Sequence, residues 1–116
     1  MPRRAYAALM SVRIDLADLP ETVARFGPAY LLTTRDDRVK VLSVAPAMDG
    51  SRLTLTTSSH GSAENLAANR VATLVFPPIP PEEMTLLIDG TATAQDRLIV
   101  FTPEWAVLHQ PATPEP

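Results

Sequence analysis

The chain has 116 residues, of which 46% are hydrophobic and 20% charged, which is the size and composition of one globular domain and not of a disordered chain. Its net charge is -3, whereas proteins that bind a nucleic-acid backbone carry an excess of positive charge. Nucleic acid is therefore not an expected partner. The absence of cysteine excludes disulfide frameworks, cysteine-type zinc sites, iron–sulfur clusters and thiol nucleophiles.

The two ends of the sequence are predicted to lie outside the folded part. Residues 1–10 form a candidate leader, with Met10 as a second candidate start, and residues 111–116 form a proline-rich tail. No apolar run approaches the roughly 18 residues that a membrane span needs. The short apolar stretch near the start is followed at once by charged Arg13, unlike a signal peptide. We therefore expect a single cytoplasmic domain within residues 1–116 and no membrane partner.

The first predicted element is a short helix over residues 16–26, where apolar residues recur at helical spacing. Asp18 is suited to cap its start together with Glu21, and Gly27 is suited to end it. Beyond Gly27 the pattern changes to short β-rich runs that are separated by turn residues, which predicts strands.

These runs predict a mainly β fold, an antiparallel barrel or sandwich. Arg35-Asp36 and Asp49-Gly50 are the predicted turns. Residues 62–69 are a predicted helical crossover, and residues 103–110 a predicted short helix that begins at a proline. The six predicted strands cover residues 29–34, 37–45, 52–57, 70–76, 85–94 and 97–102.

The second predicted strand, residues 37–45, is apolar on both of its faces. A barrel of this size has only one interior, so one set of side chains must point outward. That set is either Leu42 and Val44 or Val39 and Val41. Because soluble monomers rarely expose such a strip, the sequence predicts a two-fold partner, a second copy of the chain, that covers it.

The most informative polar segment lies between a strand and a helix, at residues 57–62. Thr57, Ser58, Ser59 and Ser62 offer hydroxyl groups there. Gly61 allows close approach of the backbone, and the start of the following helix presents free N–H groups, so the segment is suited to hold an anion. The simpler interpretation is that one of these serines only caps the helix.

Four stretches, in this order, carry a resemblance to a known family: GPAYLLTTRDDRVKVLSV, MDGSRLTLTTSSHGSAENLAANRVATLVF, TLLIDGTATA and TPEWAVLHQP. Together, from about Gly27 to Pro111, they resemble the pyridoxamine 5'-phosphate oxidase-like, flavin-binding split barrels, and most of all the small actinobacterial-type members. The resemblance implies a six-stranded antiparallel split β-barrel with short helices, which dimerises and holds flavin mononucleotide (FMN) or the deazaflavin coenzyme F-420 between its subunits.

The resemblance also implies where the cofactor lies. Its phosphate meets the polar loop, and its ring lies on the second strand. The cofactor-binding residues expected on this basis are Leu42, Ser43, Val44, Thr57, Ser58, Ser59, His60, Ser62 and Asn65.

The chain departs from the family pattern at the phosphate loop, where family members usually carry a basic pair and this sequence has His60-Gly61-Ser62. A charge-assisted hydrogen bond to a phosphate is worth roughly 1.5–3 kcal/mol. The cation must therefore come from elsewhere. Four basic residues on neighbouring strands are candidates: Arg38, Lys40, Arg52 and Arg70.

Trp105 and His109 are spaced to share one face of the predicted terminal helix. Either Trp105 simply packs on the barrel, or one of the two reaches the ligand of a partner subunit. Asp89-Gly90 interrupts an apolar strand, which favours a β-bulge over a catalytic carboxylate. No Ser-His-Asp grouping, metal-ligand spacing or P-loop is present in the sequence, so no metal site is expected.

The function expected from the resemblance is hydride transfer between a flavin or deazaflavin and a small organic substrate, with the cofactor carrying the chemistry. An alternative is a non-catalytic binding module on the same fold, which sequesters a flavin, haem or another flat ligand at the dimer interface. The third hypothesis is a purely structural dimer with a vestigial site, which binds no small molecule.

Overall fold

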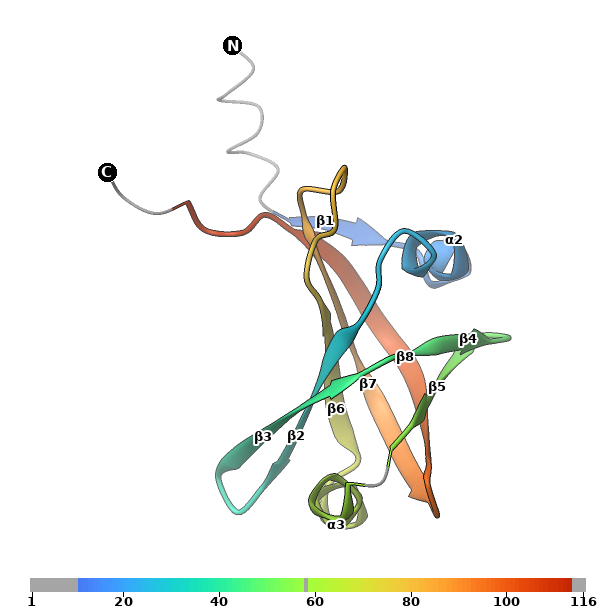
Figure 1. Cartoon of the computed structure of the whole chain (residues 1–116), viewed down its shortest axis with the longest axis vertical. Helices are drawn as coiled ribbons and strands as arrows, with labels where there is room; N and C mark the ends of the chain where they lie inside the picture. Colours follow the sequence, from blue (N-terminus) through green and yellow to red (C-terminus); the bar gives the residue numbers. More distant parts are fainter. Residues whose placement is uncertain (1–10, 58, 114–116) are drawn as a thin grey trace.

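The computed structural model describes residues 11–57 and 59–113, and in this part of the chain one antiparallel sheet of eight strands carries the fold. The strand order is β3-β2-β6-β7-β8-β5-β4, and β1 pairs with β8 beside this path (Figure 1). The strands are β1 (Ser11–Ile14), β2 (Ala29–Arg35), β3 (Arg38–Val44), β4 (Ala47–Asp49), β5 (Arg52–Thr56), β6 (Val71–Phe76), β7 (Thr85–Gln95) and β8 (Leu98–His109).

The sheet coils around one apolar core but does not close into a full barrel, because β3 and β4 stand at its two ends and do not pair with each other. This is a split barrel, as predicted. Successive side chains of a strand point to opposite faces of the sheet, so every second side chain points into the barrel. These inward side chains are almost all apolar. The fully buried core is formed mainly by Leu31, Leu53, Leu55, Leu74, Phe76, Leu86, Ile88, Ile99 and Phe101.

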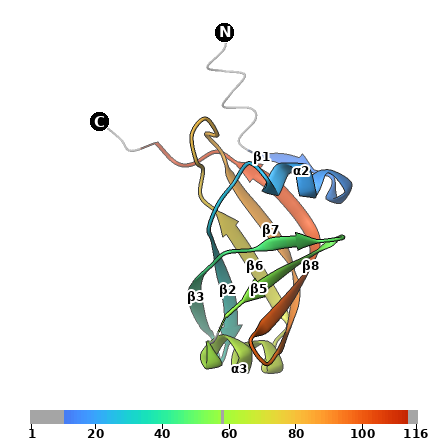
Figure 2. The ribbon, with the colours of Figure 1, turned by 45° about the vertical axis from the view of Figure 1, so that its right-hand side comes forward.

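Short helices lie at opposite ends of the barrel (Figure 2). The 3₁₀ turn η1 (Leu16–Asp18) and helix α2 (Leu19–Val23) lie at one end, near β1. Helix α3 (His60–Ala68) connects β5 to β6 at the other end, below the β2–β3 hairpin. The barrel end that α3 covers is therefore the end at which the predicted polar loop lies.

The six predicted strands are all present, and two short strands, β1 and β4, add to them. The first predicted helix is also present but shorter than expected: α2 ends at Val23, three residues before the predicted end, and Asp18 makes no side-chain cap bond. The first hairpin turn lies one residue later than predicted, at Asp36-Asp37, where both residues have positive φ. Two consecutive positive φ values are the type I′ geometry that matches the twist of a hairpin.

The predicted helix over residues 103–110 is wrong, because β8 continues through Pro103 as a strand to His109. A register shift at Asp89/Gly90 in the pairing of β7 with β8 absorbs the extra residue there, so the predicted β-bulge is confirmed. Gly90 is required at this point because a Cβ on it would lie 2.1 Å from the backbone oxygen of Thr102. Packing against β7 and β1 outweighs the local helix signal of the proline.

The outward set of strand β3 is Val39 and Val41, which are 62% and 57% exposed. Val44 is buried and Leu42 packs against the core, so both point inward. This decides between the two alternatives that the sequence left open. The outer face of the sheet therefore carries apolar side chains that nothing in the described chain covers.

Candidate functional site

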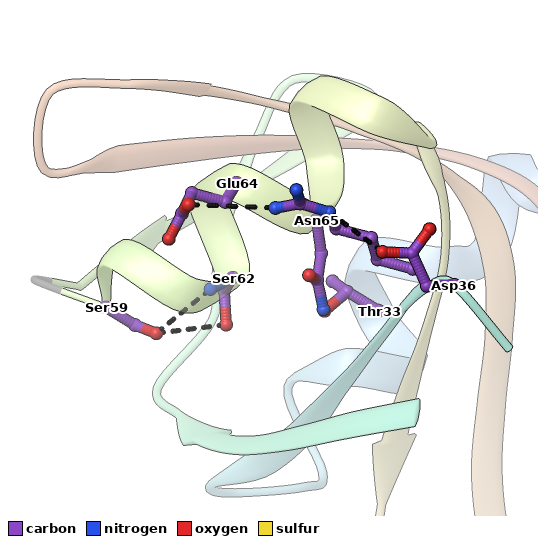
Figure 3. A network of polar contacts seen from close by, with 7 residues as sticks. Thr33, Asp36, Ser59, Ser62, Glu64 and Asn65 are labelled. Carbon is purple, nitrogen blue, oxygen red and sulfur yellow. Dashed lines mark hydrogen bonds and ion pairs between the residues drawn. The ribbon is translucent and has the colours of Figure 1, made fainter. Parts of the chain in front are cut away.

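Helix α3 begins at the polar loop, and Ser59 caps it. The Ser59 hydroxyl oxygen accepts a hydrogen bond from the Ser62 backbone N–H at 3.2 Å and lies 3.1 Å from the Ser62 hydroxyl (Figure 3). Ser62 is only 1% exposed. These two serines thus stabilise the helix start, and the backbone N–H groups of His60 and Gly61 are the donors that the cap leaves for a ligand.

Two asparagines fix helix α3 against strand β2. The Asn65 side-chain amide donates to the Thr33 hydroxyl at 3.1 Å, and the Asn69 amide donates to the Thr34 hydroxyl at 2.9 Å. Thr33 is buried, so its bond to Asn65 is shielded from water. The position of the helix start relative to the β2–β3 hairpin is therefore set by specific hydrogen bonds as well as by packing.

Lys40 is the cation that the fold brings to the helix start. It lies on β3 directly opposite Thr33 in the register of the β2–β3 hairpin, and its side chain runs over Gly61. A Cβ built on Gly61 would lie 3.1 Å from Lys40 Cε and 3.3 Å from its Nζ. The ammonium group therefore sits beside the first turn of α3, where the helix dipole also favours an anion.

A cavity of about 410 Å³ opens beside Lys40. Its size is within the usual range of small-molecule sites, roughly 300–1,000 Å³. Arg35, Arg38 and Lys40 supply three positive charges to its wall. The remaining lining residues are Asp36, Val39 and Asn65.

Arg35 is neutralised locally, whereas the other two cations are not. Its guanidinium lies 3.6 Å from both Asp36 and Glu64, which ties the hairpin turn to α3 (Figure 3). Neither Arg38 nor Lys40 forms an ion pair within residues 11–57 and 59–113. The cavity therefore carries an excess of positive charge that no described protein carboxylate balances.

A second cavity, of about 570 Å³, lies at the same hairpin. Arg35, Asp36 and Val39 line both cavities. Thr34, Asp37, Ala68 and Asn69 complete the second one. The two cavities thus meet at the β2–β3 hairpin; the basic one reaches α3 at Asn65, and the other reaches the end of the helix at Ala68 and Asn69.

The residues predicted to carry the cofactor ring do not share one face. Ser43 is exposed on the outer face of β3, whereas Leu42 and Val44 point into the barrel. A flat ligand can therefore meet Ser43 or the inward pair, but not all three from one side. Strand β3 is, however, an edge strand, so its backbone N–H and C=O groups on one side are free to bind a ligand.

The predicted loop residues come together only in part. The Thr57 hydroxyl accepts from the Ser59 backbone N–H at 3.1 Å, which shapes the loop, and His60 is exposed in the first turn of α3. Asn65 both bonds to Thr33 and lines the basic cavity. Ser58 lies outside the described residues.

Trp105 and His109 lie on the outer face of β8, so the structure places them away from the basic cavity. Trp105 is 45% exposed, and the Arg13 guanidinium lies 4.1 Å from its ring centroid, a cation–π contact. His109 Nδ1 lies 3.1 Å from the Ser11 hydroxyl of β1. Both side chains therefore help to hold β1 against β8.

Sequence reasoning named Lys40 only as one of four candidate cations, and it did not name Arg35 as a lining residue. The signal for Lys40 is its place on the strand: it is opposite Thr33, and Thr33 binds the helix through Asn65. Among the described residues, no helix is long and apolar enough to cross a membrane. Nor do three or more potential metal ligands gather anywhere in that part of the chain.

No family model matches the sequence. An uncharacterised protein of Mycobacterium bovis is 30% identical over 120 residues, which cover 89% of this chain and 84% of that protein. The similarity thus extends along nearly the full length of both proteins.

Solved structures show the same fold. The chain matches an FAD-binding protein from Mesorhizobium loti with a TM-score of 0.69 at 8% identity, over 88% of this chain and 98% of that one. It matches a candidate pyridoxamine 5'-phosphate oxidase from Listeria innocua with a TM-score of 0.66 at 13% identity, over 80% and 96%. An F420 reductase gives a TM-score of 0.56 at 16% identity, over 79% and 92%. The chain therefore belongs to one family with the uncharacterised mycobacterial protein, and it has the fold of the pyridoxamine 5'-phosphate oxidase-like split barrels.

Proposed function

We propose that this protein binds FMN or coenzyme F-420 with the cofactor phosphate between Lys40 and the first turn of α3. The observation that carries the proposal is the position of the Lys40 side chain over Gly61. A cation at a helix start gives a phosphate both a charge-assisted hydrogen bond and free backbone N–H donors. This replaces the basic pair that the loop itself lacks.

The basic cavity fits such a group in charge and in size. Arg38 and Lys40 are unpaired among the described residues, and the cavity volume of about 410 Å³ is in the range of small-molecule sites. The Asn65 amide, held by Thr33, adds a fixed polar group to the same wall. The residues that would hold the phosphate are therefore Lys40, Arg38 and the backbone of the first turn of α3.

The ring of the cofactor is expected to follow the free edge of strand β3. Unpaired backbone N–H and C=O groups of an edge strand can bind the polar rim of a flat heterocycle. Ser43 is the exposed member of the predicted ring contacts, and Leu42 and Val44 support the strand from inside. A bound flavin or deazaflavin supplies hydride chemistry, while this chain orients it and excludes water.

The outer face of the sheet supports the homodimer part of the proposal. Soluble monomers rarely expose large contiguous apolar patches, and a two-fold partner covers such a face with one self-complementary surface. The sheet register continues this face from Tyr30 through Val75 and Leu87 to Val107, and it places Val41 opposite Leu32. The most exposed apolar members are Tyr30, Val39, Val41, Val71 and Trp105.

The reaction that we propose is hydride transfer to a small organic substrate in the cytoplasm. The support is the fold, which this chain shares with an F420 reductase and with FAD-binding proteins. The alternative is a carrier that holds a flavin, haem or other flat ligand without turning it over. The two differ in one measurable property, the redox exchange of the bound cofactor.

The test measures the affinities of the purified protein for FMN, coenzyme F-420 and riboflavin by fluorescence titration. In Lys40→Met, the affinity for the phosphorylated cofactor should fall about tenfold, in line with the loss of a charge-assisted bond, and riboflavin binding should stay the same. Arg97→Met is the matched control, because Arg97 is an exposed cation in the turn between β7 and β8.

Equal effects of Lys40→Met on FMN and riboflavin would contradict the phosphate position. Failure of the wild-type protein to bind either phosphorylated cofactor at high micromolar concentration would contradict the cofactor proposal as a whole. If the cofactor binds but no donor reduces it and no acceptor reoxidises it, the carrier alternative is correct.

A further inference from the structure

A third cavity, distinct from the two at the β2–β3 hairpin, lies on the outer face of the barrel where β7 and β8 pair. Its volume is about 240 Å³, below the usual range for a whole drug-sized ligand and sufficient for one polar group of a small molecule. It shares no lining residue with the basic cavity beside Lys40. The lining residues are Arg52, Arg70, Thr91, Ala92, Thr93, Val100 and Thr102.

The sheet register brings three threonine side chains together in this cavity. Thr91 on β7 lies opposite Thr102 on β8, and Thr93 is two residues further along β7, so all three are on one face. Thr91 and Thr102 come from neighbouring strands, which are about 4.8 Å apart. The cavity floor is therefore a small group of hydroxyls with the apolar side chain of Val100 beside it.

Two arginines flank this floor from opposite sides. Arg52 begins β5, whose pairing with β8 places it next to Thr102. Arg70 precedes β6, and its backbone oxygen accepts a hydrogen bond from the Ala92 N–H at 2.8 Å, which fixes it beside β7. Each arginine thus has a backbone position set by the sheet, with the threonines between them.

The polar groups of this cavity are unused by the protein itself. In the part of the chain that the structure describes, the hydroxyls of Thr91, Thr93 and Thr102 have no intramolecular hydrogen bond. Neither Arg52 nor Arg70 takes part in any of the ion pairs found there. No acidic residue lines the cavity. Guanidinium and hydroxyl donors without a protein acceptor are the donor set that an oxyanion requires.

We propose that Arg52 and Arg70 bind an oxyanion, a phosphate or a carboxylate group of a small molecule, with the threonine hydroxyls as further donors. The site is separate from the proposed cofactor site and does not rest on it, and it borders the proposed dimer face, because Val71 lies opposite Thr91. Val39, which lines the cavity beside Lys40, lies on β3, three strands away from Thr91 on β7. At about 4.8 Å per strand this is roughly 14 Å, so the two sites can be occupied by different groups.

The test follows the amide and methyl resonances of Thr91, Thr93 and Thr102 by NMR while inorganic phosphate or succinate is added at constant ionic strength. We expect saturable shifts that concentrate on these three threonines. The double variant Arg52→Gln, Arg70→Gln should weaken the binding at least tenfold. Arg97→Gln, which removes an exposed arginine outside the cavity, should change it less than twofold.

The two probes distinguish the sources of the oxyanion, since tighter binding of phosphate indicates a phosphorylated ligand and tighter binding of succinate a carboxylate. Thr91→Val is a second variant that keeps the shape of the side chain, and it should weaken binding about threefold while the dispersed spectrum of the folded protein persists.

Three results would overturn the proposal. The first is the absence of saturable shifts with either probe, and the second is equal weakening by Arg97→Gln and by the double variant. The third is a change of oligomeric state in the double variant when the wild-type protein shows no saturable shifts with either probe. That result would assign Arg52 and Arg70 to contacts with a second copy of the chain.

Discussion

The side chain of Lys40 on β3 lies directly over Gly61 in the first turn of α3, with its Cε 3.1 Å from the position that a Cβ on residue 61 would take. Two residues that are 21 positions apart in the sequence thereby place a cation next to free backbone N–H groups. The glycine permits this close approach, because a Cβ at position 61 would push the end of the lysine side chain away by a few tenths of an ångström. The absence of a side chain at Gly61 therefore contributes to the position of the Lys40 ammonium group.

Gly61→Ala should affect ligand binding and stability in opposite directions. The new methyl group displaces the flexible lysine by a few tenths of an ångström, so we expect the affinity for FMN to fall several-fold. Alanine is the better helix former by up to about 1 kcal/mol, so the free energy of unfolding should stay the same or rise. Fluorescence titration and urea denaturation measure the two quantities. A loss of stability together with unchanged FMN binding would contradict the arrangement.

Val41→Asp tests the outer face as a dimer interface. Val41 is 57% exposed in the single chain, so an aspartate there costs the monomer fold little, whereas burial of that charge against a partner is unfavourable. We expect the wild type to sediment as a dimer at micromolar concentration and the variant as a folded monomer, whose urea midpoint, unlike that of the wild type, does not depend on protein concentration. Ser51→Asp, in the exposed β4–β5 turn, is the control and should remain dimeric. A monomeric wild type would contradict the interface.

Gly90→Ala should be among the most destabilising single substitutions in the chain. Its Cβ would lie 2.1 Å from the Thr102 backbone oxygen, so the pairing of β7 with β8 must shift to make room. We expect a loss of about 3 kcal/mol or more in the free energy of unfolding. Gly50→Ala is the matched control: it has φ +62 but nothing within 4 Å, so only backbone strain of about 1 kcal/mol applies. Similar losses for the two variants would contradict this account.

Asp37→Gly should stabilise the β2–β3 hairpin. Asp36 and Asp37 both have positive φ, and Asp-Gly is a preferred pair for a type I′ turn. Relief of the strain at φ 62 should raise the free energy of unfolding by about 0.5 kcal/mol, as measured by urea denaturation. Asp37→Ala keeps the strain without the local hydrogen-bonding capacity of aspartate, so it should destabilise. A gain with alanine would show that charge, not backbone conformation, controls this turn.

The fold was predictable because the strands alternate or are bounded by turn residues, and the errors occurred where a local signal opposed tertiary pairing. Pro103 suggested a helix start, yet the residues after it extend β8 because β1 and β7 pair with them on either side. The sequence shows Trp105 and His109 four residues apart, which places them on one face of a helix and equally on one face of a strand. Spacing alone therefore could not distinguish the two.

The candidate site was predictable only in its location. The sequence indicates an anion-binding loop before α3, but it assigns ligand roles to serines that the fold uses otherwise: Ser59 caps the helix, and Ser62 is a buried residue of its first turn. The cation depends on strand register, which places Lys40 opposite Thr33 and hence beside the helix. Register is set by long-range packing, and four basic residues were equally eligible without it.

The free edge of β3 has a thermodynamic consequence. Among residues 11–57 and 59–113, the hairpin is attached to the sheet only through β2, and it carries Lys40 on its inner side and Val39 and Val41 on its outer side. A second copy that packs on the valines would restrain the same ribbon that positions the lysine, so association and cofactor binding would stabilise each other through linkage. We therefore expect the apparent cofactor affinity of this protein to rise with its own concentration.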